Sequence, residues 1–180
     1  TNDLPYKEQK NVPLEFAEVA SMSMELLASP YLNEFYSEAD VARHRVEHIE
    51  KILLFWPYMA VVDAFQQWAY THPEGAEPDA CDAQWRALVQ RFIPAIDFDG
   101  LDDVMATGWH RKLHIFNVPF YYVEYGLAQL GAAQVWRNSL TDHPRAVADY
   151  RSALRLGGTA TLPQLFATAG ARFAFDAGTL

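Results

Sequence analysis

The sequence predicts an all-α fold, an irregular multi-helix domain, and three observations support that prediction. Apolar residues recur at helical spacing over long stretches, strand signals are weak throughout, and Pro, Gly and Asn punctuate the helical stretches. With 180 residues and 51% hydrophobic content, the chain is long enough to bury one substantial core. We therefore expect a single domain over residues 1–180, built from about six helices.

The second of the first two predicted helices is the longest predicted element of the chain. One is expected over residues 13–28, where a proline opens it and a Ser-Pro pair ends it. Another begins after Ser37, whose hydroxyl can cap it, and continues through a kink at Pro57 to about residue 70.

The remaining helical stretches are all shorter than the helix that begins after Ser37, and several of them end at proline or glycine. In order, we expect a helix at 79–92, a short one between 100 and 109, a mostly helical stretch at 114–138, one ending at Gly157, and a last one at 162–169.

Composition excludes several classes of function. The net charge of -9, with carboxylates spread along the chain, argues against nucleic-acid binding. The longest apolar run, residues 52–62, is too short to cross a bilayer. A single cysteine, Cys81, and no signal-like N-terminal stretch favour the cytoplasm.

The first predicted helix carries acids on one face. On a helical wheel, Glu15, Glu18 and Glu25 share a side opposite the apolar residues. Since no Lys or Arg lies between residues 11 and 42, these acids have no local cationic partner. The simpler interpretation is a solvated acidic face, and the alternative is a metal ligand, because one helix can present a carboxylate to zinc.

Histidine and tyrosine are concentrated in residues 108–129. On an unbroken helix His114, Tyr121 and Tyr125 would lie on one face, with Tyr122 pointing elsewhere. Even if Pro119 restarts the helix, Tyr121 and Tyr125 stay four residues apart. Histidine and tyrosine can donate to the oxyanion of peptide hydrolysis, but aromatic stripes are most often core.

A different metal motif lies on the second predicted helix. His44, Glu47 and His48 satisfy the inverted zinc pattern HxxEH, which alone could describe a complete peptidase site. Such a short pattern recurs by chance, and the neighbouring Arg43, Arg45 and Lys51 disfavour a bound dication.

Two strings resemble the oligoendopeptidase F and thimet oligopeptidase family of zinc metallopeptidases. The first is VPLEFAEVASMSME at residues 12–25, similar to the segment that follows the family's HExxH helix. The second, GWHRKLHIFNVPFYYVEYGLAQ at residues 108–129, resembles the family's His-to-Tyr motif. The resemblance covers essentially the whole chain, as the back portion of a longer catalytic domain, and implies a helical fold and peptide hydrolysis with zinc.

The resemblance also implies roles for individual residues. Glu18 matches the family's third zinc ligand, and Glu25 matches a later acid that lies beside the ligands. His114 and a tyrosine match the groups that stabilise the oxyanion; family members differ in spacing here, so Tyr121, Tyr122 and Tyr125 are all candidates, with Tyr121 and Tyr125 preferred.

No HExxH occurs in this sequence, so we expect the isolated chain to bind no zinc stably and to be inactive as a peptidase. The complete enzyme would act on peptide substrates, and a segment bearing HExxH is an expected partner. An uncovered acidic and aromatic face would also favour a homo-oligomer. Two alternatives remain open: a non-catalytic helical binding or structural module, and an independent HxxEH enzyme.

Overall fold

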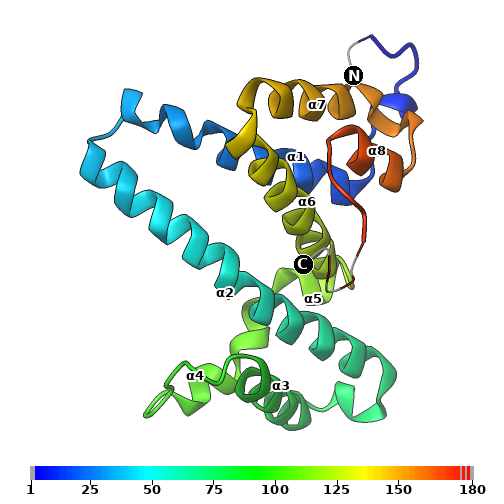
Figure 1. Ribbon diagram of the computed structural model, residues 1–180. Helices are drawn as coiled ribbons and strands as arrows, with labels where there is room; N and C mark the ends of the chain where they lie inside the picture. The colour runs from blue at the N-terminus through cyan, green and yellow to red at the C-terminus, as the bar shows by residue number, and fades with distance from the viewer. Residues whose placement is uncertain (1–2, 175, 177, 179–180) are drawn as a thin grey trace. The chain divides into compact units, whose positions relative to one another are not determined.

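A computed structural model describes residues 3–174, 176 and 178 of the protein. Over these residues the chain is helical, with eight α-helices joined by short 3-10 helices and loops (Figure 1). The all-α prediction is therefore confirmed. The described chain divides into two compact units: unit 1 takes residues up to Val46 and from Glu124 onward, and unit 2 is Glu47–Val123.

The helix boundaries agree closely with the sequence in the first half of the chain. Helix α1 spans Leu14–Ala28 and α2 spans Glu38–Thr71, with Pro57 inside it. Ser37 caps α2 as predicted: its Oγ donates to Asp40 Oδ2 at 2.6 Å and accepts from the Asp40 amide at 3.2 Å. Helix α3 covers Pro78–Phe92, within one residue of the predicted span.

Five further α-helices follow in the chain, and the longest predicted stretch among them is divided in two. The stretch predicted at 114–138 is divided into α5, Leu113–Asn117, and α6, Tyr122–Thr141. The others are α4 at Asp102–Ala106, α7 at His143–Leu156 and α8 at Leu162–Thr168. None of the helices in the described part of the chain has the length and apolar character needed to cross a membrane.

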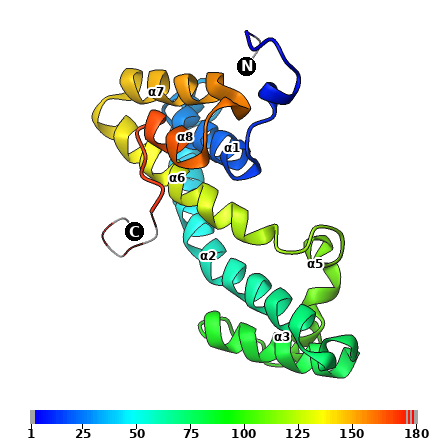
Figure 2. The same ribbon diagram turned by 90° about the vertical axis from the view of Figure 1, so that its right-hand side faces the viewer.

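Unit 1 is organised around the crossing of α1, α6, α7 and α8. In both views α7 and α8 lie against α1 (Figure 1 and Figure 2). A Cβ on Gly131 of α6 would come within 2.7 Å of the Phe166 ring and 3.0 Å of Val19, so glycine is required for this close approach. The core residues are Phe16, Val19, Leu27, Ala128, Val135, Ala153, Leu165, Phe166, Ala169 and Ala171.

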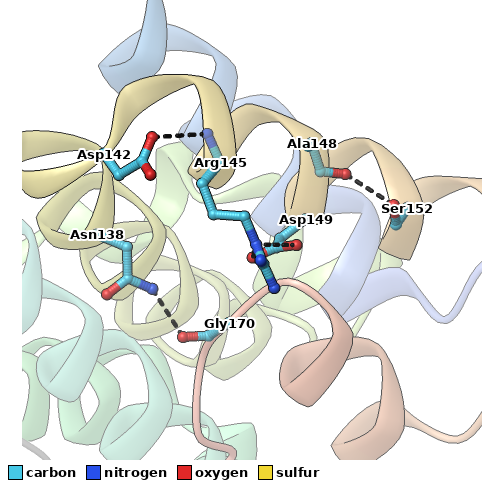
Figure 3. Close-up of polar contacts among 7 residues, drawn as sticks. All are labelled: Asn138, Asp142, Arg145, Ala148, Asp149, Ser152 and Gly170. Atoms are coloured by element: carbon cyan, nitrogen blue, oxygen red, sulfur yellow. Dashed lines mark hydrogen bonds and ion pairs between the residues drawn. The ribbon is translucent and has the colours of Figure 1, made fainter.

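Polar contacts fix the ends of α6 and α7 in unit 1 (Figure 3). Asp142 caps α7 by accepting from the Arg145 amide at 3.1 Å, and Arg145 pairs with Asp149 one turn later. Asn138 donates to the Gly170 carbonyl at 2.8 Å, where Gly170 has φ +76° and ends α8. Side chains therefore satisfy main-chain groups at the start of α7 and just after α8.

Unit 2 packs an aromatic core between α2 and α3. Phe65 of α2 meets the Trp85 ring edge-on, with ring centroids 5.2 Å apart. Trp109 lies 5.5 Å from the same Phe65 ring, and its indole N–H donates to Asp82 at 2.7 Å. This core supports the short helices α4 and α5, which follow α3 in the chain.

Candidate functional site

The two faces of α1 divide as the helical wheel predicts. Glu15 and Glu18 are half-buried and Glu25 is exposed. The Ser21 hydroxyl lies 3.2 Å from Glu18 Oε2 and 3.0 Å from the Glu18 carbonyl oxygen, so it can donate to either. The buried residues are those expected on the inner face: Phe16, Val19, Ser23, Leu26 and Leu27.

A second acid meets this face from α6. Glu124 forms a side-chain hydrogen bond with Glu15, and burial, followed by the Glu15 charge and this bond, raises the pKa of Glu124 to about 7. Glu124 Oε2 is buried and meets no hydrogen-bond donor. Because two carboxylates can hydrogen-bond only when one is protonated, the pair retains a shared proton below about pH 7.

Sequence reasoning missed Glu124, although a signal was present. The acid follows two tyrosines and a valine and precedes a run of small and apolar residues, where a solvated carboxylate is out of place. Its partner could not be found from spacing, because Glu15 lies on a helix distant in the sequence.

The donor set of the described residues does not fit a zinc site by itself. Catalytic zinc normally takes three protein ligands and a water molecule. Glu18 offers a suitable carboxylate oxygen, but no group of three or more His, Cys, Asp or Glu residues in the described ranges could hold a metal ion. The sequence contains no HExxH to supply two histidines.

The inverted zinc motif on α2, HxxEH, is not part of any metal-binding group among the described residues either. His44 and Glu47 are exposed and His48 is half-buried, all within one helix. No metal-holding group of three includes them among the residues that the structure describes. Within the described residues, no additional ligand accompanies the HxxEH pattern as a zinc site would need.

The histidine and tyrosine candidates lie around a corner rather than along one helix. Helix α5 ends at Asn117 and α6 begins at Tyr122, so the unbroken-helix alignment is wrong. The His114 ring nevertheless stacks on Tyr121, with centroids 5.9 Å apart and planes inclined by 19°. The corner between α5 and α6 therefore brings the His114 and Tyr121 rings together.

Tyr122 does not point elsewhere, which corrects the sequence prediction. Its ring lies 5.0 Å from His114 in an edge-on arrangement and also packs on Phe55 and Tyr58. Only 8% of Tyr122 is exposed, whereas Tyr121 is half-buried. The restart of the helix at Tyr122 turns this side chain inward, because the chain direction changes at the corner.

Lys112 adds a positive charge to the same cluster. Its Nζ lies 4.5 Å from the centre of the Tyr58 ring and 5.6 Å from that of Tyr122. An ammonium over an aromatic face is attracted by the ring quadrupole. The His114 cluster is therefore both aromatic and cationic, which suits an oxygen that becomes negative during a reaction.

Unit 2 also contains a mostly apolar cavity of about 470 Å³. Tyr58 lines it and joins it to the aromatic cluster around Tyr122. His110 and Arg111 provide its polar lining together with Thr107. A cavity of this size and character can hold an apolar side chain.

The candidate residues divide between the two units. Glu18 and Glu25 belong to unit 1, as does Tyr125 in the first turn of α6, where it is half-buried. His114, Tyr121 and Tyr122 belong to unit 2, where the rings of both tyrosines lie beside His114.

Comparisons with known proteins identify a family. The family described as Peptidase family M3 matches residues 2–180. No curated protein shows a significant match.

Several solved structures are similar over nearly the whole chain. PZ peptidase A, solved with an inhibitor, has a TM-score of 0.89 and 32% identity over 99% of this chain and 32% of its own. An oligoendopeptidase F structure has a TM-score of 0.87 and 34% identity, and the match covers 96% of this chain and 31% of that one. Another oligoendopeptidase F structure, from Bacillus anthracis str. Ames, has a TM-score of 0.78 and 27% identity. The match covers 98% of this chain and 28% of that one. The chain thus spans about a third of the length of these relatives.

Proposed function

The chain belongs to peptidase family M3, and from that premise we propose that it forms part of a zinc-dependent peptide-hydrolysing site. Glu18 would be one zinc ligand, with Glu25 as an acid beside it, and His114 with a tyrosine would bind the oxyanion. The observation that carries the proposal is the stack of His114 on Tyr121 in the segment that resembles the family's His-to-Tyr motif.

The geometry of unit 2 supports Tyr121 over Tyr122 as the oxyanion donor. Tyr122 is buried among Phe55, Tyr58 and His114, as a core residue would be. Tyr121 is partly exposed while it remains stacked on His114, so a substrate could reach its hydroxyl. Hydrogen-bond donors held in place before the reaction stabilise the developing charge without reorganisation. Tyr125 remains a second candidate.

The isolated chain would be inactive, because it provides one ligand of the expected set. In an assembled site zinc would supply the activated water that attacks the peptide. The natural partner is therefore a segment that carries HExxH, and the substrates are peptides, as the names of the relatives indicate. A cytoplasmic location, which the single cysteine favours, belongs to the same proposal.

Elemental analysis of the purified 180-residue chain tests the first part of the proposal. We expect no stoichiometric zinc in the wild type, in Glu18→Ala or in His44→Ala. Stoichiometric zinc that is lost in His44→Ala would instead favour the independent HxxEH enzyme.

Reconstitution tests the second part. The chain is mixed with the HExxH-bearing remainder of an oligoendopeptidase F, and cleavage of a quenched fluorescent peptide is followed with and without a chelator. We expect chelator-sensitive hydrolysis, reduced about 10²–10³-fold by His114→Ala or Tyr121→Phe, as for the loss of one oxyanion donor. Exposed Glu50→Gln on α2 serves as a control that leaves the rate unchanged.

Absence of hydrolysis in a complex that assembles would favour the non-catalytic binding module. Size-exclusion chromatography of the chain alone tests the expected homo-oligomer: a dimer lost on Phe120→Asp supports it, and a strict monomer contradicts it.

A further inference from the structure

The corner between α5 and α6 has an unusual backbone at Phe120. Phe120 has φ +64°, and it is the only residue other than glycine with a positive φ in the part of the chain that is described. A bulky side chain rarely adopts this left-handed conformation, which persists only where the surroundings impose it. Something in unit 2 must therefore hold the corner in this shape.

Gln66 of α2 provides one restraint. The Phe120 amide donates to Gln66 Oε1 at 2.8 Å, across 54 residues of sequence. Because an amide N–H can only donate, the atom of Gln66 that faces it must be the oxygen. The corner's own hydrogen bond, from the Tyr121 amide to the Val118 carbonyl, is longer at 3.2 Å.

The burial of Gln66 indicates that its oxygen is needed. Its side chain is 0% exposed, and its Nε2 has no hydrogen-bond partner. Burying an unsatisfied amide donor is unfavourable, so a leucine or methionine would suit this position better if only packing mattered. The carbonyl of the amide therefore has a specific use, which is the Phe120 hydrogen bond.

Tyr70, one turn further along α2, holds the other side of the corner. Its hydroxyl donates to the Ile115 carbonyl of α5 at 2.8 Å, and its ring packs on Phe120 with centroids 5.5 Å apart. One face of α2 thus fixes both α5, which carries His114, and the residue immediately before Tyr121.

We propose that Gln66 is a positioning residue whose amide oxygen fixes the left-handed backbone of Phe120 and thereby sets the stack of His114 on Tyr121. The catalytic use of that stack rests on the proposed function, whereas the positioning can be measured without activity. In this role Gln66 acts through the backbone of the corner, by accepting the hydrogen bond of the Phe120 amide.

The test is NMR of the His114 ring protons in the full chain. Nearby aromatic rings shift these resonances, so a change in them reports a change in how His114 packs on Tyr121 and Tyr122. In Gln66→Leu we expect at least half of the ring-induced shift to disappear, together with the hydrogen-exchange protection of the Phe120 amide. Gln129→Leu is the matched control: Gln129 of α6 is also buried, 6% exposed, with an unpartnered Nε2, and its replacement should leave His114 unchanged.

Two further variants connect the effect to the backbone. Gln66→Glu, measured at pH 5, keeps an acceptor oxygen and should restore the His114 shift and the Phe120 protection. Phe120→Gly adopts a positive φ without strain and should partly restore the shift when combined with Gln66→Leu. If Gln66→Leu does not fold, Gln66→Glu decides: a retained shift with protected Phe120 supports the proposal, and a lost shift in a folded protein overturns it.

A folded Gln66→Leu with wild-type His114 resonances would also overturn it. The reconstituted peptidase separates this failure from that of the proposed function. If the stack is lost in Gln66→Leu but hydrolysis keeps its kcat, the catalytic use of the stack is wrong while the positioning stands. If the positioning by Gln66 and the catalytic use of the stack are both correct, Gln66→Leu should lower kcat about tenfold or more. KM should change little, because the substrate-binding surface remains.

Discussion

The acidic face of α1 and the corner between α5 and α6 present their candidate groups by different means. Glu18 is displayed by a regular helix whose opposite face is buried in the core of unit 1. His114 and Tyr121 meet across a break in the helical structure, where the Phe120 amide donates a hydrogen bond to Gln66 Oε1. The first display depends on many apolar contacts, and the second depends on a few polar ones, so the two should respond to different substitutions.

Removal of a core side chain beneath the acidic face of α1 should have the largest effect on stability. Phe16 is 0% exposed and packs on Phe166 with centroids 5.9 Å apart. We expect Phe16→Ala to lower the free energy of unfolding by about 3–5 kcal/mol, measured by urea denaturation. Met24→Ala, at a position that is 60% exposed on the same helix, is the control and should change it by less than about 0.5 kcal/mol.

A matched pair of tyrosines sharpens the comparison. The hydroxyl of Tyr70 donates to Ile115 in unit 2, and that of Tyr150 donates to Ala20 in unit 1, both at 2.8 Å. Replacement of either by phenylalanine should cost about 0.5–1.5 kcal/mol, because each removes one hydrogen bond to a main-chain carbonyl. Only Tyr70→Phe should also move the His114 resonances. Equal movement in both variants would mean that the stack responds to general destabilisation.

The Glu15–Glu124 pair, which lies at the acidic face of α1, predicts that stability depends on pH. The pKa of Glu124 is raised from 4.5 to about 7, so the folded state binds more protons than the unfolded state between these values. Stability should therefore decline as the pH rises from about 4.5 through about 7. Since Glu124 is partly exposed, solvent screening keeps the effect at about 1 kcal/mol or less.

Thermal melts of wild type and Glu124→Gln at several pH values measure this effect. The glutamine variant should lack this part of the decline, because its side chain does not titrate. An unchanged pH dependence in Glu124→Gln would assign the decline to other groups.

The smallest effect is expected at the surface of α7. Arg145 is paired with Asp149 at 2.8 Å (Figure 3). Its side chain is nevertheless 74% exposed. Asp149→Asn should leave the denaturation midpoint and the His114 resonances unchanged within error, since exposed ion pairs contribute little. A clear loss of stability would indicate that the pair has a structural role beyond α7.

The sequence by itself determined the helical class, most helix boundaries in the first half of the chain, and the division of α1 into acidic and buried faces. These features depend on contacts between residues close in sequence, such as the Ser37 cap with Asp40, and on a period that the residues display directly. It also contained the motifs that resemble the peptidase family, to which the chain belongs.

Only the tertiary structure decided the break at residues 118–121, the inward turn of Tyr122, the pairing of Glu124 with Glu15, and the restraint of Phe120 by Gln66. In the sequence Gln66 is an ordinary polar residue on a long helix, and Phe120 is one aromatic residue among several. Their relation depends on a hydrogen bond between distant segments, whose presence no local period or propensity encodes.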